Sequence, residues 1–104
     1  MNRLSLLIKN APADTSAAIR FAKASNDTGV RVYCVFFYGK GVLHAKGGEK
    51  QFWSAWAREV GARLILCSAS AEIYGLKADD NFSVEGLGEL FMAGLTNDKV
   101  VSFG

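Results

Sequence analysis

The sequence predicts a single α/β domain, spanning residues 1–104, built on a mostly parallel sheet with helices on both faces. Apolar runs of strand length alternate repeatedly with stretches whose apolar residues recur at helical spacing. The strongest runs are nearly continuous in hydrophobicity, which is typical of strands covered on both faces. The chain has 104 residues, 50% of them hydrophobic, which suits one compact core. Such alternation calls for right-handed crossovers between parallel strands.

The chain begins with a strand and a helix. Leu4–Ile8 is a short apolar run, and Asn10 and Pro12 mark the loop that follows it. From Ser16 to Asp27, apolar residues recur at helical spacing while charged residues face away, and Gly29 supplies the stop.

The second strand and helix are separated by a glycine-rich loop. Val30–Phe37 is rich in β-branched and aromatic residues, so we expect a central strand. Tyr38–Glu49 contains four glycines and the only histidine, His44, and is predicted to be a loop with room for one short turn of helix. Gln51–Val60 then carries an apolar helical face.

The last third of the chain repeats the alternation. Ala62–Cys67 is the third strong strand, and Ser68–Tyr74 is predicted to be a short helix. Phe82–Val84 fits either a short strand or an extended approach to the next helix. We expect that helix over Gly86–Asn97 and a final strand over Lys99–Phe103.

The charge, the cysteines and the glycine spacing argue against several classes of protein. The net charge is only +2 and the basic residues are scattered, so neither nucleic-acid nor membrane binding is predicted. The two cysteines fit no secreted disulfide scaffold, zinc site or C-x-x-C pair, and they suit a reducing, cytoplasmic compartment. Gly39-Lys40-Gly41 lacks the spacing of a P-loop or a dinucleotide-binding fingerprint. No cofactor or metal ion is therefore expected.

Cys67 is the main candidate for chemistry. It ends a predicted strand directly before a predicted helix, where free helix N–H groups favour the thiolate over the thiol. The carboxyl ends of parallel strands are also where ligands gather in open sheets. The alternative is a buried cysteine that only fills space. Cys34 lies inside a strand, and packing explains it.

Two further features allow both a functional and a structural interpretation. His44, in its glycine-flanked loop, is a second candidate that would orient or deprotonate Cys67; the alternative is a loop histidine in solvent or at a subunit contact. Trp53 and Trp56 share a helix face with Phe52. They either cover the sheet or extend into a subunit contact.

Four segments in order resemble the DsrE/TusD sulfur-relay family. They are Phe36–Tyr38 with Gly41 and Val42, Leu64–Cys67 with Ala69 and Ala71, Phe82–Leu90, and Asp98–Phe103. The resemblance covers nearly the whole chain. It implies a three-layer α/β/α sandwich with a five-stranded, mostly parallel sheet. It also implies a cysteine that carries sulfane sulfur as a persulfide, and only Cys67 matches that position.

The resemblance further implies a cytoplasmic protein that forms homo-oligomers or assembles with related subunits. Its partners would be sulfur donor and acceptor proteins, in tRNA thiolation or dissimilatory sulfur metabolism. One departure concerns the helix after the cysteine, which often carries a basic pair in the family and here has Ile73 and Tyr74. That departure bears on the partner surface more than on the thiol.

Three functions follow as hypotheses. The leading one is a sulfur carrier, with sulfurtransferase activity through a cysteine persulfide at Cys67. The second is a non-catalytic structural or regulatory subunit of a DsrE-like oligomer, in which Cys67 is no more reactive than Cys34. The third is a small-molecule binding domain that uses the His44 loop.

Overall fold

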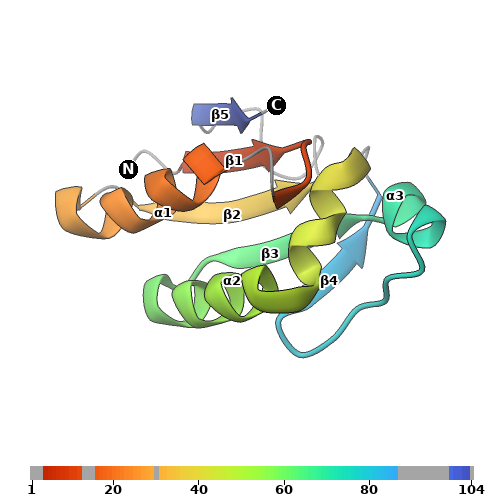
Figure 1. Cartoon of the computed structure of the whole chain (residues 1–104). Helices are drawn as coiled ribbons and strands as arrows, with labels where there is room; N and C mark the ends of the chain where they lie inside the picture. The colour runs from red at the N-terminus through yellow and green to blue at the C-terminus, as the bar shows by residue number, and fades with distance from the viewer. Residues whose placement is uncertain (1–3, 13–15, 30, 87–98, 104) are drawn as a thin grey trace.

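The computed structural model describes residues 4–12, 16–29, 31–86 and 99–103. Its centre is a five-stranded sheet in the order β4-β3-β2-β1-β5, in which every pair of neighbouring strands is parallel (Figure 1). The strands are β1 (Leu4–Ile8), β2 (Val32–Phe37), β3 (Arg63–Cys67), β4 (Phe82–Glu85) and β5 (Lys99–Phe103). The predicted α/β sandwich on a five-stranded sheet is confirmed, and the segment from Phe82 is a strand.

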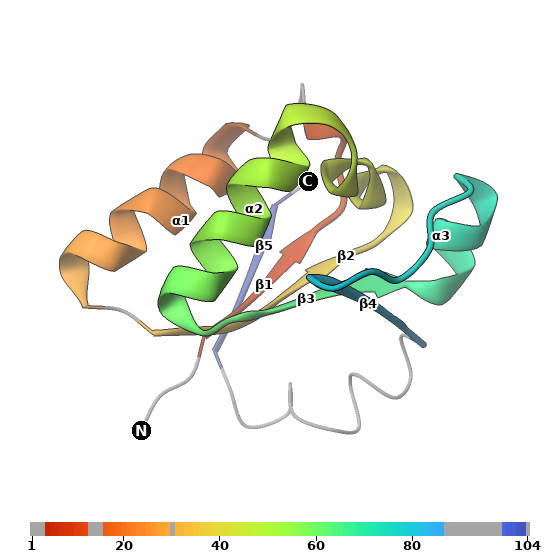
Figure 2. The ribbon, with the colours of Figure 1, turned by 90° about the horizontal axis from the view of Figure 1, so that it is seen from below.

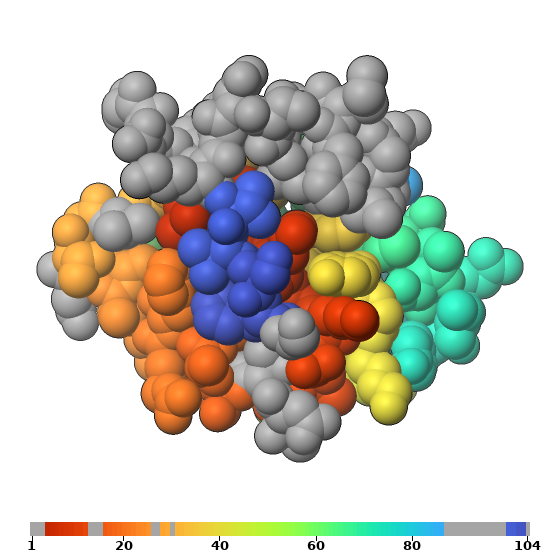
Figure 3. Space-filling view, turned by 90° about the horizontal axis from the view of Figure 1, so that it is seen from above, coloured from red at the N-terminus to blue at the C-terminus, as the bar shows by residue number. Residues whose placement is uncertain are grey.

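The two long described helices lie on the same face of the sheet (Figure 2). They are α1 (Ser16–Thr28) and α2 (Gly47–Val60). A short helix, α3 (Ser68–Ile73), follows β3 directly. In the space-filling view of Figure 3, β5 lies at the surface near α1, and α3 stands out on the opposite side of the molecule. The helix expected over Gly86–Asn97 falls largely on residues 87–98, outside the described residues.

The expected start of the second helix at Gln51 is wrong, because α2 begins at Gly47. Glycine has a low helix propensity, so Gly47 and Gly48 resemble loop residues in the sequence. Glu49 in the first turn favours a helix here, since a negative side chain is stabilising near a helix N-terminus. The preceding loop is also more ordered than expected, because Gly39–Ala45 forms a 3₁₀ helix, η2.

The sheet separates two apolar clusters. The larger one lies under α1 and α2 and includes alternate strand residues such as Leu6, Val35 and Leu64. Trp53 and Trp56 are 0% and 3% exposed within it, so their role in covering the sheet is confirmed. The smaller cluster on the other face consists of Cys34, Phe36, Ile65 and Cys67, with Leu7, Tyr33 and Tyr38 packed against it.

One glycine allows η2 to lie against the end of β1. A Cβ atom built on Gly41 would be 2.0 Å from the carbonyl oxygen of Ile8. Real Cβ atoms do not approach a backbone oxygen this closely, so only glycine fits without displacement of the backbone. Gly41 therefore fixes η2 over the carboxyl ends of the strands, next to α3.

Candidate functional site

Cys67 is the last residue of β3, and the next residue begins α3. Its backbone is extended, with φ −61° and ψ 126°, so the chain passes from strand to helix without a loop. The thiol makes no hydrogen bond that caps the helix. Its side chain packs in the smaller cluster and is 8% exposed. The predicted placement at a strand-to-helix junction is confirmed, and the sulfur lies just beneath the surface.

Small residues and one hydrogen bond fix the helix that follows Cys67. The first turn of a helix leaves N–H groups without intrahelical partners, and those of Ser68 and Ala69 follow the thiol directly. The Gly39 N–H donates to Oγ of Ser70 at 2.8 Å, which ties α3 to η2. The glycine-rich loop that contains η2 thus positions α3 by its hydrogen bond to Ser70, and His44 takes no part in this bond.

Cys67 lies between two strands that each bring a polar side chain to the same end of the sheet. Glu85 of β4 is in register with Cys67. On the other side, Phe37 of β2 is in register with Leu66, so Tyr38 and Cys67 both follow that pair. Tyr38 packs against the Cys67 cluster, and its ring stacks on Phe36 with a centroid distance of 6.1 Å.

Tyr38 and Glu85 were not among the predicted site residues. Both belong to segments that the sequence analysis had identified, the start of the glycine-rich loop and the fourth strand. Each becomes a neighbour of Cys67 only through the order and register of the strands. A prediction of strand order would have found them, because in-register residues of parallel strands share a face.

Cys34 shares the face of Cys67 but not its end of the sheet. It is in register with Arg63, four residues before Cys67, which corresponds to about 13 Å along the strands. A disulfide requires Cα atoms within about 7 Å, so the two cysteines cannot pair without movement of the strands. Cys34 is 2% exposed and its Sγ donates to Oγ of Ser5 at 3.3 Å. The packing interpretation of Cys34 fits these contacts.

His44 packs against residues of the larger cluster and is 0% exposed, so the alternative of a loop histidine in solvent is wrong. Its Nδ1 accepts a hydrogen bond from the indole N–H of Trp53 at 3.0 Å, and its ring lies 5.5 Å from that of Phe37. Phe37 and Trp53 belong to the cluster under α1 and α2, on the face opposite to Cys67. The structure therefore does not bring His44 and Cys67 together.

The environment of His44 favours the neutral imidazole. Burial lowers the pKa of His44 below its ordinary value of 6.5, and it outweighs the raising effects of the Asn10 backbone and the Glu49 charge. His44 is thus a core residue of the η2 loop.

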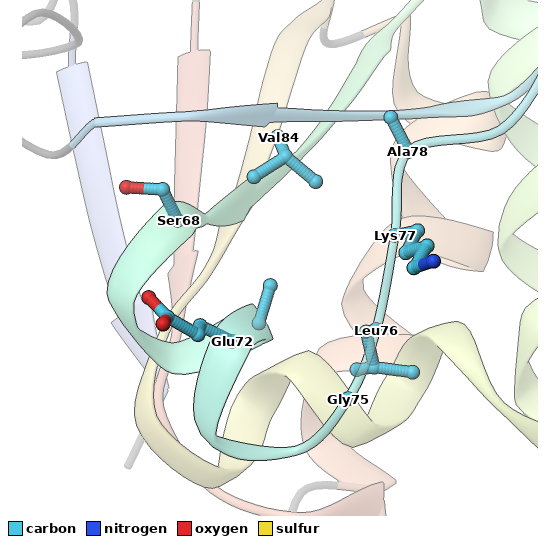
Figure 4. A pocket seen from close by; sticks show the side chains of 8 residues that line it. Ser68, Glu72, Gly75, Leu76, Lys77, Ala78 and Val84 are labelled. Carbon is cyan, nitrogen blue, oxygen red and sulfur yellow. The ribbon is translucent and has the colours of Figure 1, made fainter.

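A hollow of about 440 Å³ lies between α3, the segment that follows it and β4 (Figure 4). It is lined mainly by apolar groups of α3, of the following segment and of β4: Ser68, Ala71, Glu72, Gly75, Leu76, Lys77, Ala78 and Val84. Val84 alternates with Glu85 along β4 and packs with the larger cluster, so the hollow is on the opposite face from the thiol. Nearby, Ile73 at the end of α3 is 77% exposed.

The described part of the chain lacks both a cluster of metal ligands and a membrane-spanning helix. Residues 4–12, 16–29, 31–86 and 99–103 contain no group of three or more His, Cys, Asp or Glu side chains that could hold a metal ion. Within the same ranges, no helix has the length and apolar character needed to cross a membrane.

Comparison with known proteins gives a consistent result. The sequence model of the DsrE/DsrF-like family matches residues 2–103. "Sulfurtransferase TusD" of Serratia proteamaculans is 32% identical and aligns over 93% of this chain and 96% of its own length. Sulfurtransferases TusD of Klebsiella pneumoniae and Cronobacter sakazakii are 32% and 34% identical, each over 85% of this chain and 87% of their own.

A solved structure supports the fold. The chain superimposes with a TM-score of 0.74 on a conserved protein of unknown function from Bacteroides thetaiotaomicron, over 97% of this chain and 94% of the other. The sequence identity is 20%, so this similarity concerns the fold alone.

Proposed function

This chain belongs to the DsrE/DsrF-like family, and from that premise we propose that it is a sulfur-relay protein in which Cys67 carries the sulfur as a persulfide. The observation that carries the proposal is the position of Cys67, at the carboxyl end of β3 and directly before α3. The thiol there is next to N–H groups of the first helical turn, which have no intrahelical partner and would stabilise an anionic sulfur before and after transfer.

The proposed transfer has two steps. The Cys67 thiolate, having lost its proton to solvent, attacks the outer sulfur of a donor persulfide. A new S–S bond forms on Cys67, the donor S–S bond breaks, and the donor leaves as a thiolate. An acceptor thiolate then attacks the same sulfur and releases Cys67 as a thiolate. One sulfur atom moves in each step, and no external oxidant or reductant is consumed.

The position of Cys34 supports intermolecular transfer. About 13 Å of strand separates the two cysteines, so Cys34 is out of reach of a persulfide on Cys67. We infer that the donor and the acceptor are other proteins, and that this chain assembles as a homo-oligomer or with related subunits. We place the protein in the cytoplasm, where thiols stay reduced. With a net charge of only +2, we propose no direct contact with nucleic acid or a membrane surface.

The alternative role as a structural or regulatory subunit is less well supported. The similar proteins of Serratia, Klebsiella and Cronobacter are named sulfurtransferases. A subunit without chemistry would also need no thiol at this junction, where the side chain makes no capping hydrogen bond. The small-molecule hypothesis loses its main residue, because His44 is buried and bonded to Trp53.

The test is a loading experiment. The protein is incubated with a persulfide donor, and its peptides are analysed by mass spectrometry without reduction. We expect one added sulfur on the Cys67 peptide and none on the Cys34 peptide. Cys34→Ser is the matched control and should load like the wild type. Cys67→Ser should not load, and an equal adduct on that variant would refute the proposal.

A further inference from the structure

Three polar side chains form a connected group on the same face of the sheet as Cys67. Nη2 of Arg63 lies 2.7 Å from Oε2 of Glu85. Oγ of Ser83 lies 2.9 Å from the same oxygen and donates to it, since a carboxylate only accepts. One carboxylate oxygen thus receives two hydrogen bonds, one of them charge-assisted.

The register of the strands determines where the Glu85 carboxylate lies relative to Cys67. Cys67 and Glu85 are in register on β3 and β4, so the Cα atom of Glu85 lies beside that of Cys67. The Cα atoms of its two partners lie nearer the start of the strands, because Arg63 is the first residue of β3 and Ser83 precedes Glu85 by two residues. Both hydrogen bonds therefore draw the carboxylate back toward the start of the strands, away from the sulfur.

We propose that Arg63 is a positioning residue that holds the Glu85 carboxylate away from Cys67 and neutralises its charge, so that the thiol ionises without repulsion. A carboxylate beside a thiol disfavours the thiolate, because two negative charges then share one site. Arg63 weakens this repulsion in two ways: it holds the carboxylate at a distance from the thiol, and its own positive charge offsets the negative charge. The value of this arrangement to sulfur transfer rests on the function proposed above.

Among the residues that the structure describes, the other titratable groups around Cys67 do not duplicate this arrangement. From β2, Tyr33 and Tyr38 pack against the Cys67 cluster. From α3, Glu72 lines the hollow between α3 and β4. Lys9 follows β1, two strands away in the sheet. Glu85 is the acidic residue paired in register with Cys67.

The test is the rate at which iodoacetamide alkylates the Cys67 peptide, measured across pH by mass spectrometry. We expect Arg63→Gln to slow alkylation at neutral pH by about three- to tenfold, and to move the midpoint of the rate profile to higher pH. Glu85→Gln alone should match or exceed the wild-type rate. The double variant Arg63→Gln/Glu85→Gln should return to the wild-type rate, because no carboxylate is then left to repel the thiolate.

Two controls address charge and folding. Arg20→Gln removes an exposed positive charge from α1, on the face opposite to Cys67, and should leave the rate unchanged. Arg63→Lys keeps the positive charge and should retain most of the wild-type rate. The Arg63 side chain is 52% exposed, so these variants are expected to fold, and circular dichroism checks this.

The outcomes distinguish the proposal from its rivals. A wild-type rate for Arg63→Gln would overturn it, and so would a double variant as slow as Arg63→Gln. Slow alkylation of Glu85→Gln would also overturn it, because Glu85 would then assist the thiol directly. Alkylation needs no sulfur donor, so failure of sulfur loading would refute the proposed function and leave this result standing.

Discussion

The indole N–H of Trp53 donates to Nδ1 of His44 at 3.0 Å, and both side chains are fully buried. The indole is only a donor, so Nδ1 must be unprotonated and the imidazole neutral when this bond forms. A second proton on Nδ1 would break the bond and place a charge in the core. The pair therefore links α2 to η2 in a manner that depends on pH.

Protein stability should fall as the pH drops below about 6.5, the ordinary pKa of histidine. Burial lowers the pKa of His44, so the unfolded chain binds a proton first. The stabilising contribution is complete above the unfolded pKa and is lost as the pH falls toward the folded one. Urea denaturation at a series of pH values measures this. His44 is the only histidine, so a curve for His44→Ala with the same slope near pH 6 would contradict it.

Substitution of His44 by Ala should also cost about 2–4 kcal/mol of unfolding free energy at pH 7.5. The change leaves a cavity and a buried Trp53 N–H without its acceptor. Trp53→Phe is the complementary variant, because it removes the donor and retains an aromatic ring. Equal stability of His44→Ala and the wild type in urea denaturation would show that the bond contributes nothing.

Replacement of Gly41 by Ala should destabilise the protein by about 3 kcal/mol, since the new Cβ would meet the Ile8 carbonyl oxygen at 2.0 Å. The matched control is Gly48→Ala, where the Cβ has nothing within 4 Å and the residue lies in α2. That change should stabilise by up to about 1 kcal/mol. Thermal unfolding measures both, and equal effects would contradict the close approach of η2 to β1.

Ser70→Ala should lower the unfolding free energy by about 1 kcal/mol, because the Gly39 N–H loses the acceptor that joins η2 to α3. Ser68→Ala is the control, an exposed serine in the same helix. Hydrogen exchange offers a direct readout, since the Gly39 amide should lose protection only in Ser70→Ala. Unchanged exchange at Gly39 would indicate that the bond does not form in solution.

At acidic pH, Asp79 should no longer contribute to the free energy of unfolding. Burial raises the pKa of this carboxyl, but the hydrogen bonds from Lys50, Asn81 and Phe82 outweigh it and hold the pKa below 3.8. The stabilisation is present above that value and is lost as the pH falls through the folded pKa. Asp79 is exposed to solvent, so the effect is small. Asp79→Asn should flatten the stability curve below about pH 4, and an unchanged curve would count against these bonds.

Much of the fold could be predicted from local sequence because each central strand is buried on both faces. Val35 and Phe36 are adjacent in β2 and lie in different clusters, yet both are fully buried. This burial produces the continuous apolar runs that identify parallel strands. The placement of Cys67 at the end of such a run followed from the same pattern.

The surroundings of Cys67 could not be predicted because they depend on strand order. Glu85 is in register with Cys67 only because β4 pairs with β3, and Arg63 contacts Glu85 across the same pair of strands. The burial of His44 could not be predicted either. Its glycine-rich segment suggested an exposed loop, whereas its burial depends on Phe37 and Trp53 from two other elements.

The central claim is that Cys67 is an intermediate in sulfur transfer, and single-turnover transfer of a heavy sulfur isotope tests it most directly. A donor persulfide carrying the label is mixed with the protein and an acceptor thiol, and samples are quenched over time. The account predicts that the label appears on the Cys67 peptide first and then passes to the acceptor at a matching rate. Transfer by Cys67→Ser at the wild-type rate, or label on the acceptor with none passing through Cys67, would contradict it.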